Sequence, residues 1–502
     1  MMQTIVVHRS LDTSGMPAEA ERWWVSYALM GNASWEGTGC VRAGRSAMKG
    51  DSVPQEAVDQ LRAVISGETL TPVDAAYDAV RQVHNGMIDK RPAVIVRCQN
   101  TADIADAVKF AREHDLEISV RGGGHNVAGR AVTDSGLMID TQTMKGVHVD
   151  PATRRVRAQA GLSWNEYNRA TASYGLATTG GVVSTTGIAG LTLGGGLGWL
   201  MGKYGMAVDN VRSVELVDAN GQIHTADAEQ NPDLYWALRG GGGNFGVAAS
   251  FEYDAHPVSM IYGGLIAFAL PDAPKVWEFF GDFAAQSPDE LVLMMALVHA
   301  PDGSGHKIAA VAMCHCGDLA KGEKAAAAIR GAATPLLDML GPLPYPVQNT
   351  LLDPGFPKGA RSYWKSAYFK EITADTVSVM VDRFAQTPSI MTGMVIEDFH
   401  GAVTRVPPTA TAFPHRKPGF NLVLTGVWPD ARDDDANIAW VRDTFDALAP
   451  YTADSVYVNY LADDDTARVQ AAYGPCWDRL QQVKRTYDPE NVFHLNQNVA
   501  PA

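Results

Sequence analysis

The amino-acid sequence predicts an α+β fold in two parts, and three observations lead to this prediction. The chain has 502 residues, more than one hydrophobic core usually organises, so two domains are expected. Between residues 92 and 161, short apolar runs and a helical periodicity follow one another as in an α/β unit. Residues 263–313 and 390–428 instead carry strand patterns, with helical patterns at 318–330 and 374–386. This second part is expected to be an antiparallel sheet backed by helices.

The elements of the first part can be followed along the chain. Residues 92–98 (PAVIVRC) read as a strand, and Thr101 is placed to cap the helix that follows. Ile118 and Val120 begin another strand. Further short strands are expected at 137–140, 146–150 and 155–161.

A helix and a hairpin complete the first part. Ser163 and Glu166 have the spacing of a capping box, in which each side chain bonds a free backbone N–H at the start of a helix. Residues 214–226 read as a hairpin, with Asn220-Gly221 supplying a type I′ turn. Pro232 then opens a short helix.

The overall composition excludes several classes of protein. A net charge of −15 with no stripe of Lys and Arg argues against nucleic-acid binding. Five cysteines, an odd number, do not suggest a disulfide framework, and Cys314 and Cys316 read as buried thiols rather than metal ligands. Neither a secretory signal nor a membrane-spanning run is visible, so a soluble cytoplasmic protein is expected.

Three glycine-rich segments are the strongest functional signal. They read RGGGHN (121–126), TGGVVSTTGIAGLTLGGGLG (179–198) and RGGGGNFGV (239–247). Glycine lets a backbone approach a ligand closely, and a run of free N–H groups forms a concavity that suits a diphosphate. Arg121 is expected to add positive charge at its edge and His125 to stand at its rim. None of the segments is the nicotinamide fingerprint or a phosphate loop of the G-x-x-x-x-G-K-[ST] type, so another nucleotide-like cofactor is expected.

These segments, together with YVNY (457–460) and the tail KRTYDPENVFHLNQNVAP, resemble the berberine-bridge-enzyme-like FAD-linked oxidases of the vanillyl-alcohol-oxidase superfamily. The resemblance runs from about residue 70 to the C-terminus, and residues 260–390 match only loosely. It implies a two-part FAD-binding domain of the PCMH type over 53–257, a substrate-binding domain over 258–454, and a segment over 455–502 that returns to the FAD-binding domain. Residues 1–52 match nothing in the family and are expected to be a poorly ordered extension.

The resemblance implies FAD bound covalently through His125. Val183 stands where some relatives have a second, cysteinyl attachment, so a single link is expected. Thr186 falls where relatives control oxygen access to the flavin, and a threonine there does not decide between an oxidase and a dehydrogenase. The residues expected to contact the cofactor are Arg121, Gly122, Gly123, Gly124, His125, Asn126, Gly129, Val182, Thr185, Thr186, Gly187, Gly190, Leu191, Gly194, Val247, Asn496 and Asn498.

Three residues are candidates for the chemistry that the resemblance implies. Tyr460, the second tyrosine of YVNY, is the candidate base, although it also reads as a core tyrosine on a strand. A free phenol titrates near pH 10, so Lys365 in SYWKSAY is expected to lower its pKa. Glu397 in MVIEDFHG is the alternative base.

The function expected from this resemblance is an FAD-dependent oxidase. It transfers a hydride from a C–H bond of an alcohol or amine in a small secondary metabolite or aromatic compound, and oxygen reoxidises the flavin to give hydrogen peroxide. Two alternatives remain open. One is a dehydrogenase of the same fold with another acceptor, and the other is a flavoprotein that sequesters a toxic compound. The substrate and the oligomeric state do not follow from the sequence.

Overall fold

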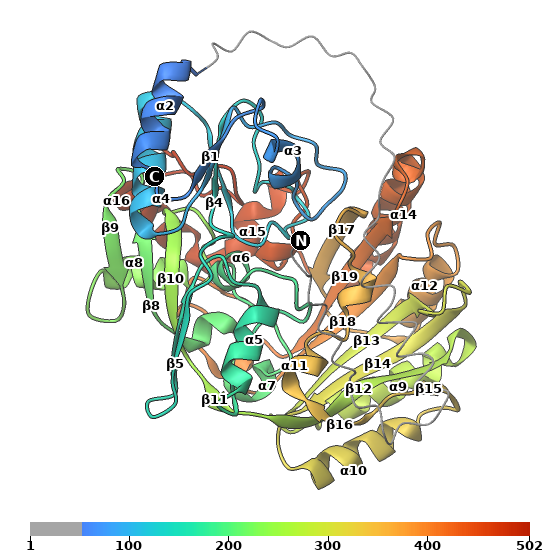
Figure 1. Ribbon diagram of the computed structural model, residues 1–502. Coiled ribbons are helices and arrows are strands. Elements are labelled where there is room, and N and C mark those ends of the chain that lie inside the picture. Colours follow the sequence, from blue (N-terminus) through green and yellow to red (C-terminus); the bar gives the residue numbers. More distant parts are fainter. Residues whose placement is uncertain (1–52) are drawn as a thin grey trace, which may run out of the picture.

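A computed structural model describes residues 53–502 of the chain, which form four β-sheets with helices around them (Figure 1). The prediction made for residues 1–52 lies outside the described residues. The α+β class predicted from the sequence is confirmed. No helix among residues 53–502 is long and apolar enough to cross a membrane.

The first sheet leads directly into the first glycine segment. Its strand order is β1-β2-β4-β3, in which β2, β4 and β3 are parallel and β1 is antiparallel to β2. Strand β3 ends at Arg121, so its carboxyl end delivers the glycines that follow. Asn100, not Thr101, caps helix α4, because its side chain accepts the Asp103 N–H. The bounds here are α2 Gln55–Val64, β1 Glu68–Leu70, α3 Tyr77–Val80, β2 Val94–Arg97, α4 Thr101–Glu113, β3 Ile118–Arg121 and β4 Leu137–Asp140.

The second sheet is antiparallel, with strand order β5-β6-β10-β8-β9. The capping box of Ser163 and Glu166 is present and begins helix α5. The predicted hairpin forms from β8 and β9, but only Gly221 of its loop has a positive φ, so the type I′ prediction is wrong. The Asp218 carboxylate instead accepts the backbone N–H groups of Asn220 and Gln222. The bounds are β5 Val147–Asp150, β6 Arg155–Gln159, α5 Trp164–Ala172, α6 Ile188–Leu193, α7 Met201–Tyr204, β8 Val211–Val217, β9 Ile223–Ala226, α8 Pro232–Leu238 and β10 Val247–Asp254; β7 (Leu176–Ala177) pairs separately with β11 (His256–Pro257).

The third large sheet has eight antiparallel strands, in the order β15-β12-β14-β13-β18-β19-β17 with β16 beside β12. Helices α9, α10, α12 and α14 back it, as the strand and helix patterns predict, although α9 lies within a stretch predicted as strand. The bounds are β12 Met260–Ala269, α9 Ala273–Ala284, β13 Leu291–His299, β14 Lys307–His315, α10 Leu319–Arg330, β15 Pro335–Asp338, β16 Gly341–Pro344, α11 Tyr345–Gln348, β17 Arg361–Tyr368, α12 Ala374–Phe384, β18 Gly393–Phe399, α13 Ala402–Arg405, β19 Gly419–Trp428 and α14 Asp434–Leu448.

Side-chain alternation gives this sheet two different faces. Met394 and Ile396 of β18 belong to the hydrophobic core beneath the helices. Val395 and Glu397, which alternate with them, point to the opposite face. This opposite face packs against the glycine-rich part of the chain, where Met294 and Cys314 share a core with Trp199 and Leu200.

The C-terminal segment returns to the glycine-rich part. In Figure 1 helices α15 (Val469–Tyr473) and α16 (Trp477–Tyr487), drawn in red, lie among the blue and green elements. Val456 and Val499 share one hydrophobic core with Val156 and Val214 of the second sheet. Because of this return, the short 3-10 helix Val458–Tyr460 reaches the place where the glycine segments meet the eight-stranded sheet.

Candidate active site

A cavity of about 300 Å³ lies between the glycine segments and the face of the eight-stranded sheet that carries Val395 and Glu397. It contains eleven of the predicted cofactor residues: Gly122, Gly123, Gly124, His125, Asn126, Val182, Thr186, Gly187, Gly190, Leu191 and Asn496. The sheet contributes Trp364, Val395, Glu397, Val423 and Thr425, and the C-terminal segment contributes Tyr457, Val458, Asn459, Tyr460 and Gln497. Residues from four distant stretches of the chain thus face one space.

The first two glycine segments touch through their backbones. A Cβ atom on Gly123 would lie 2.4 Å from the Gly187 nitrogen, and one on Gly187 would lie 2.4 Å from the Gly123 nitrogen. Gly124 has a φ of +65°, which favours glycine. A side chain at Gly123 or Gly187 would therefore force the two segments apart and open the floor of the cavity.

Six predicted cofactor residues do not line the cavity. Three of them are held by contacts elsewhere in the fold. The prediction that Arg121 adds positive charge at the edge of the cofactor site is wrong. Its guanidinium forms a buried ion pair with Asp140 at 2.6 Å, so it offers no free charge. Gly129 packs on Ile88 and has a φ of +66°. Val247 begins β10 and is part of the core.

Of the other three residues, Thr185 and Gly194 lie next to groups of the site. Thr185 Oγ1 is 3.3 Å from Nε2 of His125. Gly194 leaves room for Asn459, because a Cβ at Gly194 would lie 2.1 Å from the Asn459 side-chain oxygen. The buried side-chain oxygen of Asn498 has no hydrogen-bond partner in the described structure.

His125 stands half-buried at the rim with its ring against that of His84. The two ring centroids are 3.8 Å apart and the rings are tilted by 31°. Burial, with a smaller contribution from His84, holds the pKa of His125 well below its usual value. Burial also lowers the pKa of His84 to about 4. Both imidazoles are therefore neutral at physiological pH, and a neutral ring nitrogen keeps a lone pair available for bonding.

The YVNY motif fastens the C-terminal segment to the glycine segments. The Tyr457 hydroxyl accepts the Gly196 N–H at 2.8 Å and the Asn459 amide at 2.7 Å. The same amide donates to the Leu191 carbonyl at 3.1 Å. Asn126 in turn donates to the Asn459 carbonyl at 3.2 Å. These bonds fix the backbone that carries Tyr460.

Tyr460 and Glu397 form a hydrogen-bonded pair in the cavity wall. The Tyr460 hydroxyl donates to Glu397 Oε1 at 2.8 Å, and the Asn421 amide donates to Oε2 at 2.8 Å. Burial raises the pKa of Glu397 to about 7, against the opposing effect of the two hydrogen bonds. Burial and the neighbouring carboxylate raise the pKa of Tyr460 well above its usual range. The ring of Trp364 lies edge-on to Tyr460, with centroids 6.1 Å apart.

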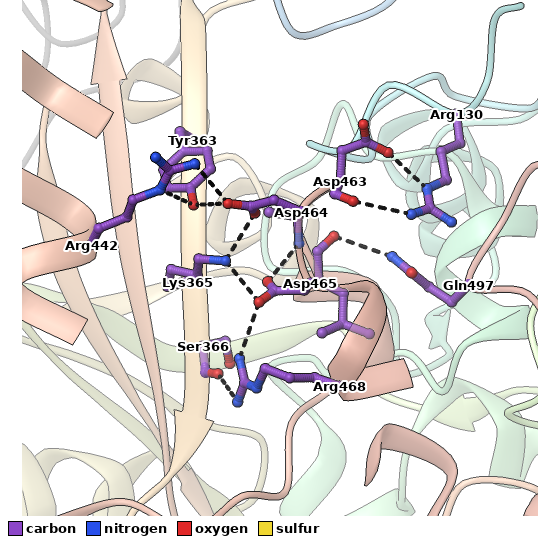
Figure 2. Close-up of polar contacts among 12 residues, drawn as sticks. Arg130, Tyr363, Lys365, Ser366, Arg442, Asp463, Asp464, Asp465, Arg468 and Gln497 are labelled. Atoms are coloured by element: carbon purple, nitrogen blue, oxygen red, sulfur yellow. Dashed lines mark hydrogen bonds and ion pairs between the residues drawn. The ribbon is translucent and has the colours of Figure 1, made fainter. Parts of the chain in front are cut away.

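Lys365 does not lower the pKa of Tyr460, and this prediction is wrong. Its Nζ lies 2.9 Å from Asp464 Oδ1 and 2.7 Å from Asp465 Oδ1, as Figure 2 shows, and Lys365 does not line the cavity. Adjacent residues of a strand point to opposite faces, so Trp364 of β17 faces the cavity and Lys365 does not.

Other cavity residues were not singled out from the sequence. They include Gly242, Gly243 and Gly246 of the third glycine segment, and Arg130, which follows the first. The glycine run at 239–247 is a signal for the first three, whereas the predicted cofactor residues include only Val247 from this segment. Arg130 had no signal beyond its charge.

The residues that line the cavity fit a flavin nucleotide. The side-chain oxygens of Asn496 and Gln497 are buried and have no hydrogen-bond partner within residues 53–502, so they are available to a ligand. Glycines line the opposite wall, where no side chain keeps a diphosphate away from the backbone. The apolar sheet wall, with the Glu397 carboxyl group beside the Tyr460 phenol of the C-terminal segment, suits the reacting part of a small substrate.

Comparisons with known proteins agree with this assignment. The profile of an FAD binding domain matches residues 92–227, and the profile described as "Berberine and berberine like" matches residues 456–500. The (R)-6-hydroxynicotine oxidase of Paenarthrobacter nicotinovorans is 30% identical over 455 residues, which cover 87% of this chain and 97% of that protein. An FAD-linked oxidoreductase of Dictyostelium discoideum is 29% identical over 412 residues, 82% of this chain and 89% of that protein. The crystal structure of 6-hydroxy-D-nicotine oxidase from Arthrobacter nicotinovorans superposes with a TM-score of 0.81 at 28% identity, over 87% of this chain and 98% of that one.

Proposed function

We propose, since this chain belongs to the berberine-bridge-enzyme-like family of FAD-linked oxidoreductases, that it is an FAD-dependent oxidase of an alcohol or amine in a small aromatic or secondary metabolite. The observation that carries this proposal is the Tyr460–Glu397 pair, which faces the same cavity as the glycine segments. Oxygen is the proposed electron acceptor because the 30% identical relative is named an oxidase. The two-part FAD-binding domain and the substrate-binding domain, divided at residues 257 and 454, belong to the same proposal.

The residues proposed to hold the cofactor surround the cavity on its glycine side. Gly122, Gly123 and Gly187 would accept the diphosphate close to the backbone, and Asn496 would bond a polar edge of the nucleotide. When bound there, FAD would supply a two-electron acceptor for the hydride that the substrate loses, with oxygen as the proposed final acceptor and hydrogen peroxide as its product. We propose one covalent attachment through a nitrogen of His125, whose neutral ring supports that role.

The proposed proton acceptor is Glu397, acting through Tyr460. Hydride loss from a carbon that bears an O–H or N–H requires removal of that proton. The Tyr460 oxygen can receive the substrate's proton while its own proton moves to Glu397 Oε1, 2.8 Å away. A pKa of about 7 matches Glu397 to this task, because at neutral pH a large fraction of its carboxyl groups is ionised. This pair favours turnover over simple sequestration of a ligand.

The sheet wall of the cavity indicates the charge of the substrate. Trp364, Val395, Val423 and Thr425 are uncharged, and Glu397 is the single charged residue that the eight-stranded sheet contributes. A carboxylate substrate would meet the Glu397 carboxylate with no cation from the sheet to balance it. Neutral or cationic aromatic alcohols and amines are therefore the proposed class.

Anaerobic reduction with a substrate panel tests this proposal. Aromatic amines and alcohols are expected to bleach the flavin absorbance of the purified protein under argon, whereas analogues that differ only by an added carboxylate are expected to bleach it at least about tenfold more slowly. Tyr460→Phe is expected to bind the active compounds but to bleach slowly. Tight binding of compounds without bleaching by any of them would instead support the sequestering flavoprotein.

A further inference from the structure

Lys365 is bonded to the stretch of chain that directly follows Tyr460. We call residues 461–465 the post-tyrosine turn. Lys365 Nζ reaches the carboxylates of Asp464 and Asp465 at 2.9 and 2.7 Å. The side chains of Lys365 and Asp465 are only 9% and 4% exposed. Loss of Lys365 would remove the nearest cation from two carboxylates at once, one of them buried, so this contact resists opening.

The same side of the post-tyrosine turn is held by two more residues of the sheet and its helices. The Tyr363 hydroxyl, also on β17, donates to Asp464 Oδ2 at 2.6 Å. Arg442 of α14 donates to the same oxygen at 2.8 Å and to the Tyr363 hydroxyl at 3.1 Å (Figure 2). Asp464 thus joins the turn to a strand and to a helix at once.

The opposite side of the post-tyrosine turn is bonded to the glycine-rich part. Gln497 donates to the Leu461 carbonyl at 3.2 Å. The Arg130 guanidinium lies 3.3 Å from the Asp463 carboxylate (Figure 2). The turn is therefore fixed between the two walls of the cavity, and Tyr460 is the residue that directly precedes the turn.

We propose that Lys365 is a positioning residue that, through Asp464 and Asp465, holds the post-tyrosine turn so that Tyr460 keeps its hydrogen bond to Glu397. The inference rests on the proposed function, in which Tyr460 and Glu397 accept the proton. Lys365 touches neither the cavity nor the Tyr460–Glu397 pair, so its effect is transmitted through the backbone of the turn.

The pKa of the Glu397 carboxyl group depends on whether Tyr460 keeps its hydrogen bond to it. The Tyr460 hydroxyl bond opposes the rise in pKa that burial causes at Glu397. Loosening the turn removes that bond, so Glu397 should bind its proton up to a higher pH. The titratable groups that interact with Glu397 are Tyr460, Tyr457 and Tyr368, whose pKa values are all raised, so none of them titrates in the same pH range.

Infrared difference spectra of the FAD-loaded protein, recorded against pH, test the proposal without a substrate. The Glu397 carboxyl band is the one that Glu397→Gln removes. Lys365→Met and Tyr460→Phe are each expected to raise its titration midpoint by about one pH unit, the effect of one lost hydrogen bond. The double variant is expected to show no further shift, because both changes remove the same bond. Lys365→Arg, which keeps the charge, is expected to titrate as the wild type does.

Two results would overturn the proposal in distinguishable ways. If Tyr460→Phe shifts the midpoint and Lys365→Met does not, Lys365 does not position Tyr460, while the proposed function stands. If Tyr460→Phe itself leaves the midpoint unchanged, the pairing fails and the proposed proton acceptor fails with it. Should Lys365→Met not fold, Lys365→Gln removes both ion pairs of Lys365 with a polar side chain, and the absence of a shift in that variant overturns the proposal.

Discussion

Replacing His125 with alanine is expected to abolish covalent flavin completely. The imidazole stands at the cavity rim, is neutral because burial lowers its pKa, and follows the glycines that line the cavity floor. Alanine has no nitrogen with which to form the bond, whereas the glycine segments that would bind the rest of FAD stay intact. The measurement is flavin fluorescence of the protein band on a denaturing gel, with the wild type fluorescent and His125→Ala dark.

A matched variant and two other outcomes make this test decisive. His148→Ala, at an exposed position on β5, should keep a fluorescent band. A dark wild-type band with FAD released into the supernatant would contradict the covalent link and leave the cofactor in place. A fluorescent His125→Ala band would place the link on another residue.

Glu397→Gln is expected to slow substrate-driven reduction of the flavin by about 10²- to 10⁴-fold, the usual range for loss of a general base. Glutamine keeps the size of the side chain and an oxygen for the Tyr460 hydroxyl, but its amide cannot take a proton at neutral pH. Binding of an uncharged substrate should change little, because the Trp364 face of the cavity is untouched. The measurement is the rate constant of flavin bleaching in anaerobic stopped flow.

The rate constant of flavin bleaching is expected to depend on pH through the ionisation of Glu397. Glu397, with a pKa of about 7, is protonated below that pH and cannot accept another proton. The wild-type rate should therefore rise with pH through about 7 and level off above it, and Glu397→Gln should lose that rise. Asp398→Asn, which removes the neighbouring buried carboxylate bonded to His400, serves as the control and should keep the wild-type profile. An unchanged profile in Glu397→Gln would assign the base elsewhere.

The sequence was informative where a property is local. The capping box of Ser163 and Glu166 and the positive φ of Gly124 depend on backbone geometry within a few residues, and the structure contains both features. The hairpin loop at 218–222 shows the limit of such local patterns. There the side chain of Asp218 competes for the backbone N–H groups, so Asn220-Gly221 does not form the turn that its sequence favours.

The long-range part of the site was only partly predictable. The segment of β17 was correctly expected near the site, but which of its residues faces the cavity depends on strand register, and a shift of one residue exchanges Trp364 for Lys365. The partners of Lys365 lie 99 and 100 residues further along the chain, so no local pattern predicts them. Arg121 was likewise misjudged because Asp140, on the neighbouring strand β4, neutralises it.

The central claim, that the protein is an oxidase, is tested most directly by the reaction of its reduced flavin with oxygen. The bound flavin is reduced under argon with one equivalent of dithionite and then mixed either with air-saturated buffer or, still under argon, with a quinone dye. Flavin absorbance and hydrogen peroxide are followed in both. We expect air to restore the oxidised spectrum within seconds and one hydrogen peroxide to form for each flavin. A flavin that stays reduced in air for many minutes, but is oxidised at once by the dye, would contradict the account and identify a dehydrogenase.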